Sequence, residues 1–333
     1  MDSHLLSIII PNYNNEDYIF SCLNSCVNSK VAKSRVEIVF IDDGSTDNSL
    51  NEVLKFSEEH DNVKIIKKQN AGVSSARNIG IQASQGRFIT FLDSDDEINY
   101  QSFDSVIQRL LGCNTDLLVC NSVDLDTGNN VLREYPSQYR HMQITGKDLL
   151  TSGYVRGSAC GIFYHRDLII NNNIWFEESI SLGEDSFFVL KCLMNAENIL
   201  YLDTPLYLVR ENRNSVSRNW SIKKSKLLIK NANYVKDLVQ TNRANTFESG
   251  VMNSLVFRYI SGSINRAIEF NWIAGYEPLR SELKKHRLLP ISTHTVPSNY
   301  LAICILNVSY TLFYILIVIR NSFKKAYEFF CVR

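Results

Sequence analysis

Short apolar runs alternate with amphipathic stretches through the N-terminal third of the chain. The runs are rich in β-branched and aromatic residues, and each has the length of one buried strand. They span residues 6–10, 36–41, 62–66 and 88–92. Apolar residues recur at helical spacing in residues 18–26 and 72–84. Strands that are apolar on both faces and alternate with helices predict an α/β fold with a mostly parallel central sheet flanked by helices.

The middle of the chain mixes the same signals less regularly. Further strands are expected at residues 116–120 and 161–164, and a helix over residues 184–196. The segment "ILYLDTPLYLVR" predicts two short strands on either side of Pro205. Residues 220–285 have an amphipathic helical pattern and no evident chemistry, which predicts a helical extension behind the α/β part.

Three polar loops follow the first, second and fourth predicted strands. They read "PNYNN" at residues 11–15, "DDGSTD" at 42–47 and "DSDD" at 93–96. In parallel α/β sheets the carboxyl ends of the strands meet at one edge, and ligands bind there. The sequence therefore predicts that these loops converge on one ligand site.

The loop "DSDD" crowds three carboxylates, Asp93, Asp95 and Asp96, into four residues. Their mutual repulsion is relieved by a bound cation, and Mg²⁺ or Mn²⁺ takes one or two carboxylates while leaving positions for phosphate oxygens. An ordinary Asp-rich turn that caps the next helix is the alternative for this motif taken alone.

Composition narrows the class of ligand. The formal net charge of +0 argues against a general nucleic-acid-binding protein. No G-x-G-x-x-G motif occurs, and "GKD" at residues 146–148 lacks the surrounding P-loop residues. A phosphorylated ligand would then be held by a cation on carboxylates together with basic side chains.

Residues 300–319 form the longest uncharged stretch, twenty residues of mostly apolar side chains. This is the minimum for a membrane-spanning helix. The stretch contains Asn307, Ser309 and Thr311, and both of its flanks are basic, which favours a helix lying in the membrane interface or docked on the protein. The N-terminal residues lack the features of a signal peptide, so the catalytic part is expected on the cytoplasmic side.

Four motifs in order, "SIIIPNYNNEDYIFSCLNS", "VEIVFIDDGSTDNS", "NAGVSSARNIGI" and "GRFITFLDSDD", closely resemble family 2 glycosyltransferases, which have the GT-A fold. "LGEDSFFVLKCL" is similar to the family's Glu-Asp motif, and "PLYLVRENRNSVS" to the segment that follows it. The resemblance covers about residues 5–217. The predicted organisation is a catalytic domain at 1–217, with halves 1–96 and 97–217, a helical extension at 218–299, and a hydrophobic membrane-associating helix with a basic tail at 300–333.

The resemblance implies a nucleotide-sugar donor, an inverting transfer and a role for each matching residue. Asp185 would be the general base, Glu184 would orient a sugar hydroxyl, and Asp95 would ligate Mn²⁺ or Mg²⁺. The implied donor-binding residues are Pro11, Tyr13, Asp42, Asp43, Asn70, Gly72, Arg77, Asp93 and Ser94.

The predicted function is transfer of one sugar, from a donor expected to be a UDP-sugar, to a hydroxyl of a saccharide or lipid-linked saccharide in bacterial surface polysaccharide assembly. The Gln-x-x-Arg-Trp motif of processive relatives is missing; "SVSRNW" at residues 215–220 is the nearest match. The enzyme is expected at the cytoplasmic face of the membrane, peripheral or anchored by its C-terminal helix. Arg213 is a further candidate contact for acceptor or phosphate. Two alternatives stay open: a polyprenyl-phosphate glycosyltransferase, and a non-catalytic scaffold that binds sugar nucleotides.

Overall fold

Two compact units make up the chain. The computed structural model describes residues 4–27, 35–135, 139, 143–152, 156–212, 220–241, 246–291 and 300–331. The first unit comprises Met1–Leu149, Val155–Ser179 and Glu184–Asn212, and the second comprises Leu150–Tyr154, Ile180–Gly183 and Arg213–Arg333.

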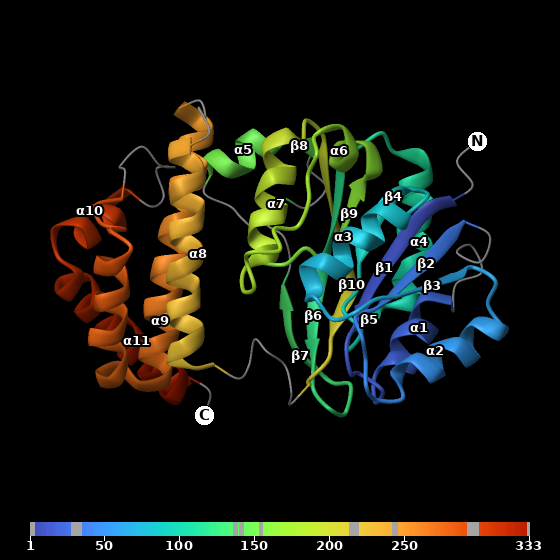
Figure 1. Cartoon of the computed structure of the whole chain (residues 1–333), viewed down its shortest axis with the longest axis horizontal. Helices are drawn as coiled ribbons and strands as arrows, with labels where there is room; N and C mark the ends of the chain where they lie inside the picture. Colours follow the sequence, from blue (N-terminus) through green and yellow to red (C-terminus); the bar gives the residue numbers. More distant parts are fainter. Residues whose placement is uncertain are drawn as a thin grey trace. The chain divides into compact units, whose positions relative to one another are not determined.

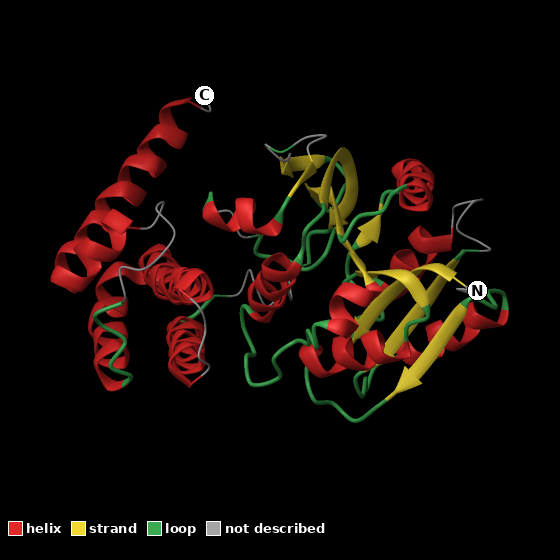
Figure 2. Ribbon diagram, turned by 90° about the horizontal axis from the view of Figure 1, so that it is seen from above, coloured by secondary structure: helices red, strands yellow, loops and turns green. Residues whose placement is uncertain are grey.

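The N-terminal half of the first unit is a regular β-α alternation. Its strands are β1 (His4–Asn12), β2 (Val36–Asp42), β3 (Val63–Lys67) and β4 (Gly86–Phe91), and its helices are α1 (Ile19–Val27), α2 (Ser49–Glu58) and α3 (Val73–Ala83). Strand β1 pairs in parallel with β2 and β4, and β2 with β3. Strands β1 and β2 are buried along nearly their whole lengths, and helices flank the sheet (Figures 1 and 2). The predicted parallel sheet is confirmed for this half.

The rest of this unit extends the sheet with mixed pairing. The added strands are β5 (Glu97–Ile98), β6 (Leu117–Leu125), β7 (Val131–Tyr135), β8 (Gln143–Ile144), β9 (Ile162–His165) and β10 (Ile199–Val209). The added helices are α4 (Tyr100–Gly112), α5 (Gly146–Thr151), α6 (Arg166–Asn171) and α7 (Glu184–Asn195). The main path runs β3-β2-β1-β4-β9-β6-β10-β5, and β9 is antiparallel to both of its neighbours. The sheet is therefore mixed on this side.

One predicted boundary is wrong. Instead of two short strands around Pro205, the structure has the single strand β10. Its pairing with β6 shifts register between Tyr201 and Pro205 and again between Pro205 and Tyr207. Proline has no N–H to donate to a neighbouring strand, so it is tolerated where the strand bulges.

An aromatic cluster ties helix α7 to the sheet. The ring of Phe188 on α7 stacks on Phe176, with centroids 4.0 Å apart, and meets Phe91 of β4 edge-on at 5.6 Å. Tyr164 of β9 contacts both Phe91 and Phe188. Such buried rings give close, orientation-dependent packing. Phe188 thereby holds the first half of α7, which carries Glu184 and Asp185, against the sheet.

The second unit contains the helices α8 (Ile222–Thr241), α9 (Thr246–Lys285), α10 (Tyr300–Val308) and α11 (Tyr310–Cys331). Helices α8 and α9 pack along each other, and Ser263 of α9 donates a hydrogen bond to the Ser225 carbonyl of α8 at 2.7 Å. The extended residues just before α7 belong to this unit: Asn231 and Tyr259 donate to the carbonyl oxygens of Leu182 and Gly183 at 2.6 and 2.8 Å.

The prediction of one hydrophobic helix through residues 300–319 is wrong, because the stretch contains two helices. Helix α10 ends at Val308 and α11 begins at Tyr310. The side chain of Asn307 exchanges two hydrogen bonds with the backbone of Ile291, each 2.7 Å long, and Ser309 accepts one from the Leu312 N–H. Among the described residues, no helix combines the length and apolar character needed to cross a membrane.

Candidate active site

The first two polar loops meet where β1 and β2 end. Asn12 lies directly across from Asp42, and Pro11 across from Ile41. The N–H of Asp43 donates to the Asn12 carbonyl at 2.8 Å, and the Asp42 carboxylate accepts from the Ser45 N–H at 3.3 Å. The predicted neighbours Pro11 and Asp42 are therefore adjacent and buried at one edge of the sheet.

Asp43 organises the loop that precedes α3. Its carboxylate accepts from the backbone N–H groups of Ala71 and Gly72 at 3.0 and 2.8 Å and forms an ion pair with Lys68. Gly44 and Gly72 both have positive φ, at 78° and 92°. A Cβ on Gly44 would lie only 2.9 Å from a backbone nitrogen of this loop, so the two loops approach through a glycine.

Each aspartate of the "DSDD" loop has a different environment. Asp93 accepts from Arg77 at 2.8 Å, and Asp95 accepts from the side-chain amide of Asn212 at 2.8 Å. Asp96 is buried and accepts from the Tyr207 hydroxyl at 2.6 Å and from the Arg210 N–H at 2.9 Å. Asp96 therefore fastens the loop to β10, whereas Asp93 and Asp95 remain at its partly exposed edge.

Ser94 and Tyr207 also hold the "DSDD" loop in place through hydrogen bonds. The Ser94 hydroxyl accepts from the Asn15 side-chain amide at 2.6 Å, which connects the loop to the end of the first polar loop. The Asp93 N–H donates to the Tyr207 hydroxyl at 3.3 Å. Burial, with the charges of Asp93 and Asp95, raises the pKa of Asp96 well above its ordinary value. Asp96 therefore holds its proton more tightly than a free carboxyl group, which lessens the repulsion among the three aspartates.

Arg77 connects Asp93 of the "DSDD" loop with Asp185, the predicted general base. Its guanidinium, on α3, is 3% exposed. It donates to Asp93 at 2.8 Å and to Asp185 at 2.6 Å, and lies 3.5 Å from Glu184. Burial opposes the charge on Arg77, but Asp185 and Asp93 outweigh it and raise its pKa. Asp185 is 108 positions away in sequence, so this buried network brings distant motifs together.

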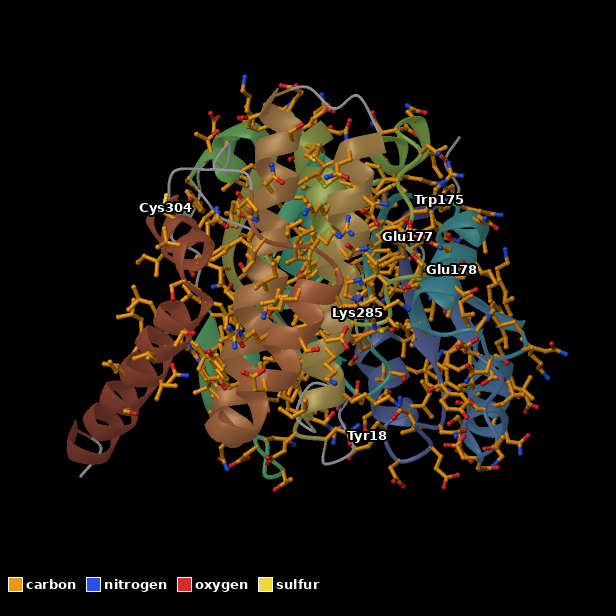
Figure 3. All side chains as sticks on the ribbon, turned by 60° about the vertical axis from the view of Figure 1, so that its left-hand side comes forward. Tyr18, Trp175, Glu177, Glu178, Lys285 and Cys304 are labelled. Atoms are coloured by element: carbon orange, nitrogen blue, oxygen red, sulfur yellow. The ribbon has the colours of Figure 1, made fainter. Side chains whose placement is uncertain are left out.

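The Arg77 side chain rests on an aromatic platform. Its guanidinium carbon lies 5.1 Å from the ring centroid of Phe176. The side chain of Asn78 donates to the Phe176 carbonyl at 3.0 Å and accepts from its N–H at 2.9 Å. Trp175, Glu177 and Glu178 of the same loop lie together in Figure 3. Asn78 of α3 therefore fixes the backbone of Phe176, and the neighbouring Arg77 packs on the Phe176 ring.

The predicted catalytic carboxylates begin helix α7. Asp185 accepts from the Ala159 N–H at 3.2 Å as well as from Arg77. Burial raises the pKa of Asp185, and Arg77 opposes that rise. Burial and the neighbouring charge of Asp185 raise the pKa of Glu184 to about 7. Perturbed carboxylates of this kind are frequent where proton transfer occurs.

These pKa shifts predict an acid limb in the pH profile of activity. We expect kcat/KM to rise with pH up to about 7 because the pair must ionise before it accepts a proton. The free energy of unfolding should change in the opposite direction. The folded state holds the Glu184 proton more tightly than the unfolded chain, so stability falls as pH rises from the ordinary carboxyl range through about 7.

The variant Glu184→Gln tests whether the charge of Glu184 sets the position of the acid limb. Removing this charge leaves Asp185 without its repelling neighbour, so the acid limb should move to lower pH. Initial rates with saturating acceptor, measured from pH 5 to 9, would test this. An unmoved acid limb in Glu184→Gln would contradict the coupling.

The donor set at the loop edge fits a hard divalent cation. Asp93 and Asp95 offer carboxylate oxygens, the ligand type that Mg²⁺ and Mn²⁺ prefer. Within the described part of the chain, no group of three or more acidic, histidine or cysteine side chains is placed to hold a metal ion. Two carboxylates would leave coordination positions on such a cation for the phosphate oxygens of a bound ligand.

The structure places most predicted residues along one edge of the sheet. Arg77, Asp93, Glu184 and Asp185 are in direct contact, and Asp42 and Asp43 shape the neighbouring loops. Tyr13 and Asn70 are exposed in those loops. Arg213 lies outside the described residues.

Sequence reasoning gave no role to several side chains that hold the site. They are Lys68, Phe176, Tyr207 and Asn212. Tyr207 and Asn212 fall inside the segment "PLYLVRENRNSVS", which was the only available signal for them. Nothing in the sequence distinguishes Phe176 from other core rings.

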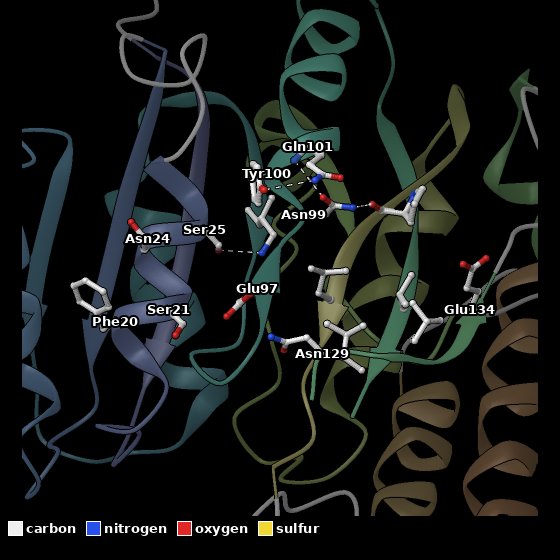
Figure 4. Close-up of a pocket in the computed structure, with 16 residues that line it drawn as sticks. Phe20, Ser21, Asn24, Ser25, Glu97, Asn99, Tyr100, Gln101, Asn129 and Glu134 are labelled. Atoms are coloured by element: carbon white, nitrogen blue, oxygen red, sulfur yellow. Dashed lines mark hydrogen bonds between the residues drawn. The ribbon is translucent and has the colours of Figure 1, made fainter. Parts of the chain in front are cut away.

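A separate pocket of about 610 Å³ lies among α1, β5, β7 and β10 (Figure 4). Its lining includes the rings of Phe20 and Tyr100 and the polar side chains of Asn24, Gln101 and Glu134. Neither Arg77 nor Asp95 nor Asp185 lines it. It is therefore distinct from the carboxylate network.

This architecture defines the class of protein. A crystal structure of S. aureus TarS 1–349 in complex with UDP-GlcNAc superposes with a TM-score of 0.66. The match covers 97% of this chain and 92% of that chain at 20% sequence identity. The mixed sheet with its acidic edge therefore has the GT-A fold.

Residues 7–171 match the sequence profile of the family described as Glycosyl transferase family 2, and this segment belongs to that family. It is 31% identical over 231 residues to the putative glycosyltransferase EpsH of Bacillus subtilis (strain 168), covering 67% of this chain and 65% of EpsH. It is 28% identical over 209 residues to the poly(ribitol-phosphate) beta-N-acetylglucosaminyltransferase TarS of Staphylococcus aureus (strain MW2), covering 62% of this chain and 35% of TarS. The matched segments thus span less than two thirds of these relatives' own lengths.

Proposed function

We propose that the chain is an inverting, metal-dependent glycosyltransferase. It moves one sugar from a UDP-sugar to a hydroxyl of a lipid-linked saccharide in bacterial surface polysaccharide assembly. The observation that carries the proposal is the contact of the buried Arg77 with both Asp93 and Asp185. One side chain thereby connects the edge that would hold the donor diphosphate with the carboxylate that would receive the acceptor proton.

Asp185 would act as the general base. In an inverting transfer the acceptor hydroxyl attacks the anomeric carbon opposite the departing nucleotide, and a carboxylate within hydrogen-bond reach takes its proton. The Ala159 N–H and Arg77 orient Asp185 from two directions. Glu184, directly before it at the start of α7, would orient a sugar hydroxyl.

Arg77 would change partners during the reaction. A bound diphosphate offers the guanidinium stronger acceptors than Asp93 alone, and arginine binds such oxygens through its planar fork. Its Nε has no hydrogen-bond partner within the described residues, so the group retains an unused donor. A shift of Arg77 toward the diphosphate would free Asp185 to accept a proton.

A divalent cation at Asp95 and Asp93 would stabilise the charge on the leaving nucleotide diphosphate. Asp95 is the better single ligand because Arg77 already neutralises part of the charge on Asp93. Asn212 fixes the orientation of Asp95 through its 2.8 Å hydrogen bond.

Removal of divalent cations is expected to abolish transfer. In excess chelator the rate should fall about a hundredfold or more, because the charge on the departing diphosphate loses its main counter-charge. Added Mn²⁺ or Mg²⁺ should restore the wild type. Asp95→Ala should remain inactive after the same addition, whereas the exposed-surface variant Asp61→Asn should be restored like the wild type. Full activity of either the chelated enzyme or Asp95→Ala would contradict the assignment.

The choice of UDP rests on the fold shared with TarS, which has been crystallised with UDP-GlcNAc. The lipid-linked acceptor and a position at the cytoplasmic face of the membrane rest on the apolar C-terminal helices. A panel of nucleotide sugars with saccharide-lipid and free polyprenyl-phosphate acceptors would test the proposal. Transfer from a UDP-sugar to the saccharide-lipid is expected. Exclusive use of the free lipid phosphate would overturn the acceptor, and binding without turnover would indicate a scaffold.

A further inference from the structure

Helix α11 has two apolar faces, and the body of the second unit covers one of them. Tyr310, Phe313, Tyr314 and Ile317 are buried. The ring of Phe313 lies 6.0 Å from that of Phe257 on α9. These contacts fix one face of α11 against the body of the second unit.

The opposite face is aliphatic and exposed. Val308, at the end of α10, is 84% exposed, and four side chains of α11 are between 42% and 48% exposed. The four are Leu312, Ile315, Leu316 and Ile319. Their spacing places them on one side of the helix. Single exposed leucines are ordinary, but a contiguous aliphatic stripe on a soluble surface indicates a binding partner.

A cationic pocket lies at the first residue of α11. Arg280, Lys284 and Arg287 surround a pocket of about 510 Å³. Its other lining residues are Leu283, Leu289 and Tyr310, so the pocket opens where α11 begins. Glu277 pairs with Arg280 at 3.1 Å. In the described part of the second unit no carboxylate pairs with Lys284 or Arg287, and both are exposed.

We propose that the aliphatic stripe of α10 and α11 and the cationic pocket at the start of α11 dock this protein onto an anionic lipid surface. The stripe enters the acyl boundary, and Lys284 and Arg287 bind lipid phosphates. An interfacial helix combines an apolar face with flanking cations in this way, and each basic residue near an anionic leaflet adds to the attraction. The inference rests on the proposed function for its biological setting, but it concerns binding and not transfer.

A second copy of the chain fits this surface less well. In a two-fold dimer the same patch lies on both sides of the interface. The stripes would meet, but neither the exposed stripe nor the pocket lining contains a carboxylate that could pair with Lys284 or Arg287 of the other copy. The observed combination of aliphatic side chains with unneutralised cations therefore favours phospholipid over self-association.

Vesicle flotation of the full chain tests the proposal. Wild type should float with vesicles of phosphatidylglycerol and phosphatidylcholine, and far less with phosphatidylcholine alone. Leu312→Ser/Leu316→Ser should weaken binding about tenfold or more, because two large apolar side chains no longer leave water. Lys284→Glu/Arg287→Glu should remove the preference for the anionic lipid. The control Val131→Ser/Leu132→Ser, two exposed residues of β7, should bind like wild type.

Three outcomes would overturn the proposal: wild type that ignores anionic vesicles, a stripe variant that binds them fully, or a dimeric wild type that the stripe variant converts to a monomer. Thermal melting checks folding, and Leu316→Ser alone serves if the double variant unfolds. Sugar transfer to a detergent-solubilised saccharide-lipid, measured without vesicles in the same preparations, separates the two proposals. Vesicle binding without sugar transfer refutes the transferase, and sugar transfer without vesicle binding refutes only the docking surface.

Discussion

Asp185→Asn is expected to lower sugar transfer by about a hundredfold to ten-thousandfold, the contribution of a positioned general base. The substitution preserves shape but removes the proton acceptor. It also replaces a carboxylate that Arg77 binds at 2.6 Å with a neutral amide. Donor binding should survive, because Arg77 and Asp93 remain. Initial rates at saturating donor, with donor affinity from calorimetry, would measure the two effects separately.

The matched control is Asp61→Asn, the same chemical change on an exposed side chain before β3. It should retain wild-type rates. Asp185→Asn with unchanged kcat would show that the base lies elsewhere. Loss of donor binding together with activity would show instead that Asp185 mainly holds the site together.

Arg77→Ala is expected to cost both activity and stability. The partly buried carboxylates of Asp185 and Glu184 would lose their cation, and breaking a buried ion pair by removing one partner typically costs about 3–5 kcal/mol. Arg77→Lys should fold better but still lose most activity, because one ammonium cannot bridge Asp93 and Asp185 as a planar fork does. Urea unfolding and initial rates would measure the two losses.

A double variant distinguishes electrostatics from lost packing. Arg77→Ala/Asp185→Asn removes both charges, so it should be more stable than Arg77→Ala alone. Arg109→Ala, on the exposed end of α4, should leave stability nearly unchanged. If the double variant is no more stable than Arg77→Ala, the contribution of Arg77 comes from its packing on Phe176 and not from the buried ion pair.

The N-terminal half of the fold could be predicted because strands β1, β2 and β4 are mostly apolar and buried along nearly their whole lengths. Strands buried on both faces occur in parallel sheets, and the polar loops at their carboxyl ends then share one edge. The sequence crowds three carboxylates into the "DSDD" loop, and the structure sets Asp96 apart from the other two by burying it against Tyr207.

Other features depended on contacts that no local pattern records. Strand β9 enters between β4 and β6 in the antiparallel direction, and four residues are too short to carry a directional signal. Pro205 looked like a strand boundary, but pairing with β6 carries β10 through it as a bulge. The break between α10 and α11 follows from hydrogen bonds between Asn307 and the distant Ile291.

The contacts among Arg77, Asp93 and Asp185 at the site were also not predictable from local sequence patterns. The motifs containing Arg77 and Asp185 were recognised separately, and each had a proposed role. Their direct contact could not be read from the sequence because 108 positions separate them. The platform under Arg77 was equally hidden, since Phe176 belongs to a segment of ordinary apolar and acidic residues.

The most direct test of the account is the anomeric configuration of the released sugar. Wild-type enzyme is incubated with an α-linked UDP-sugar and divalent cation, and proton NMR follows the first product of slow donor hydrolysis before it mutarotates. Single displacement assisted by Asp185 predicts a β-configured product, absent with Asp185→Asn. An α-configured first product, or equal hydrolysis by Asp185→Asn, would contradict the account.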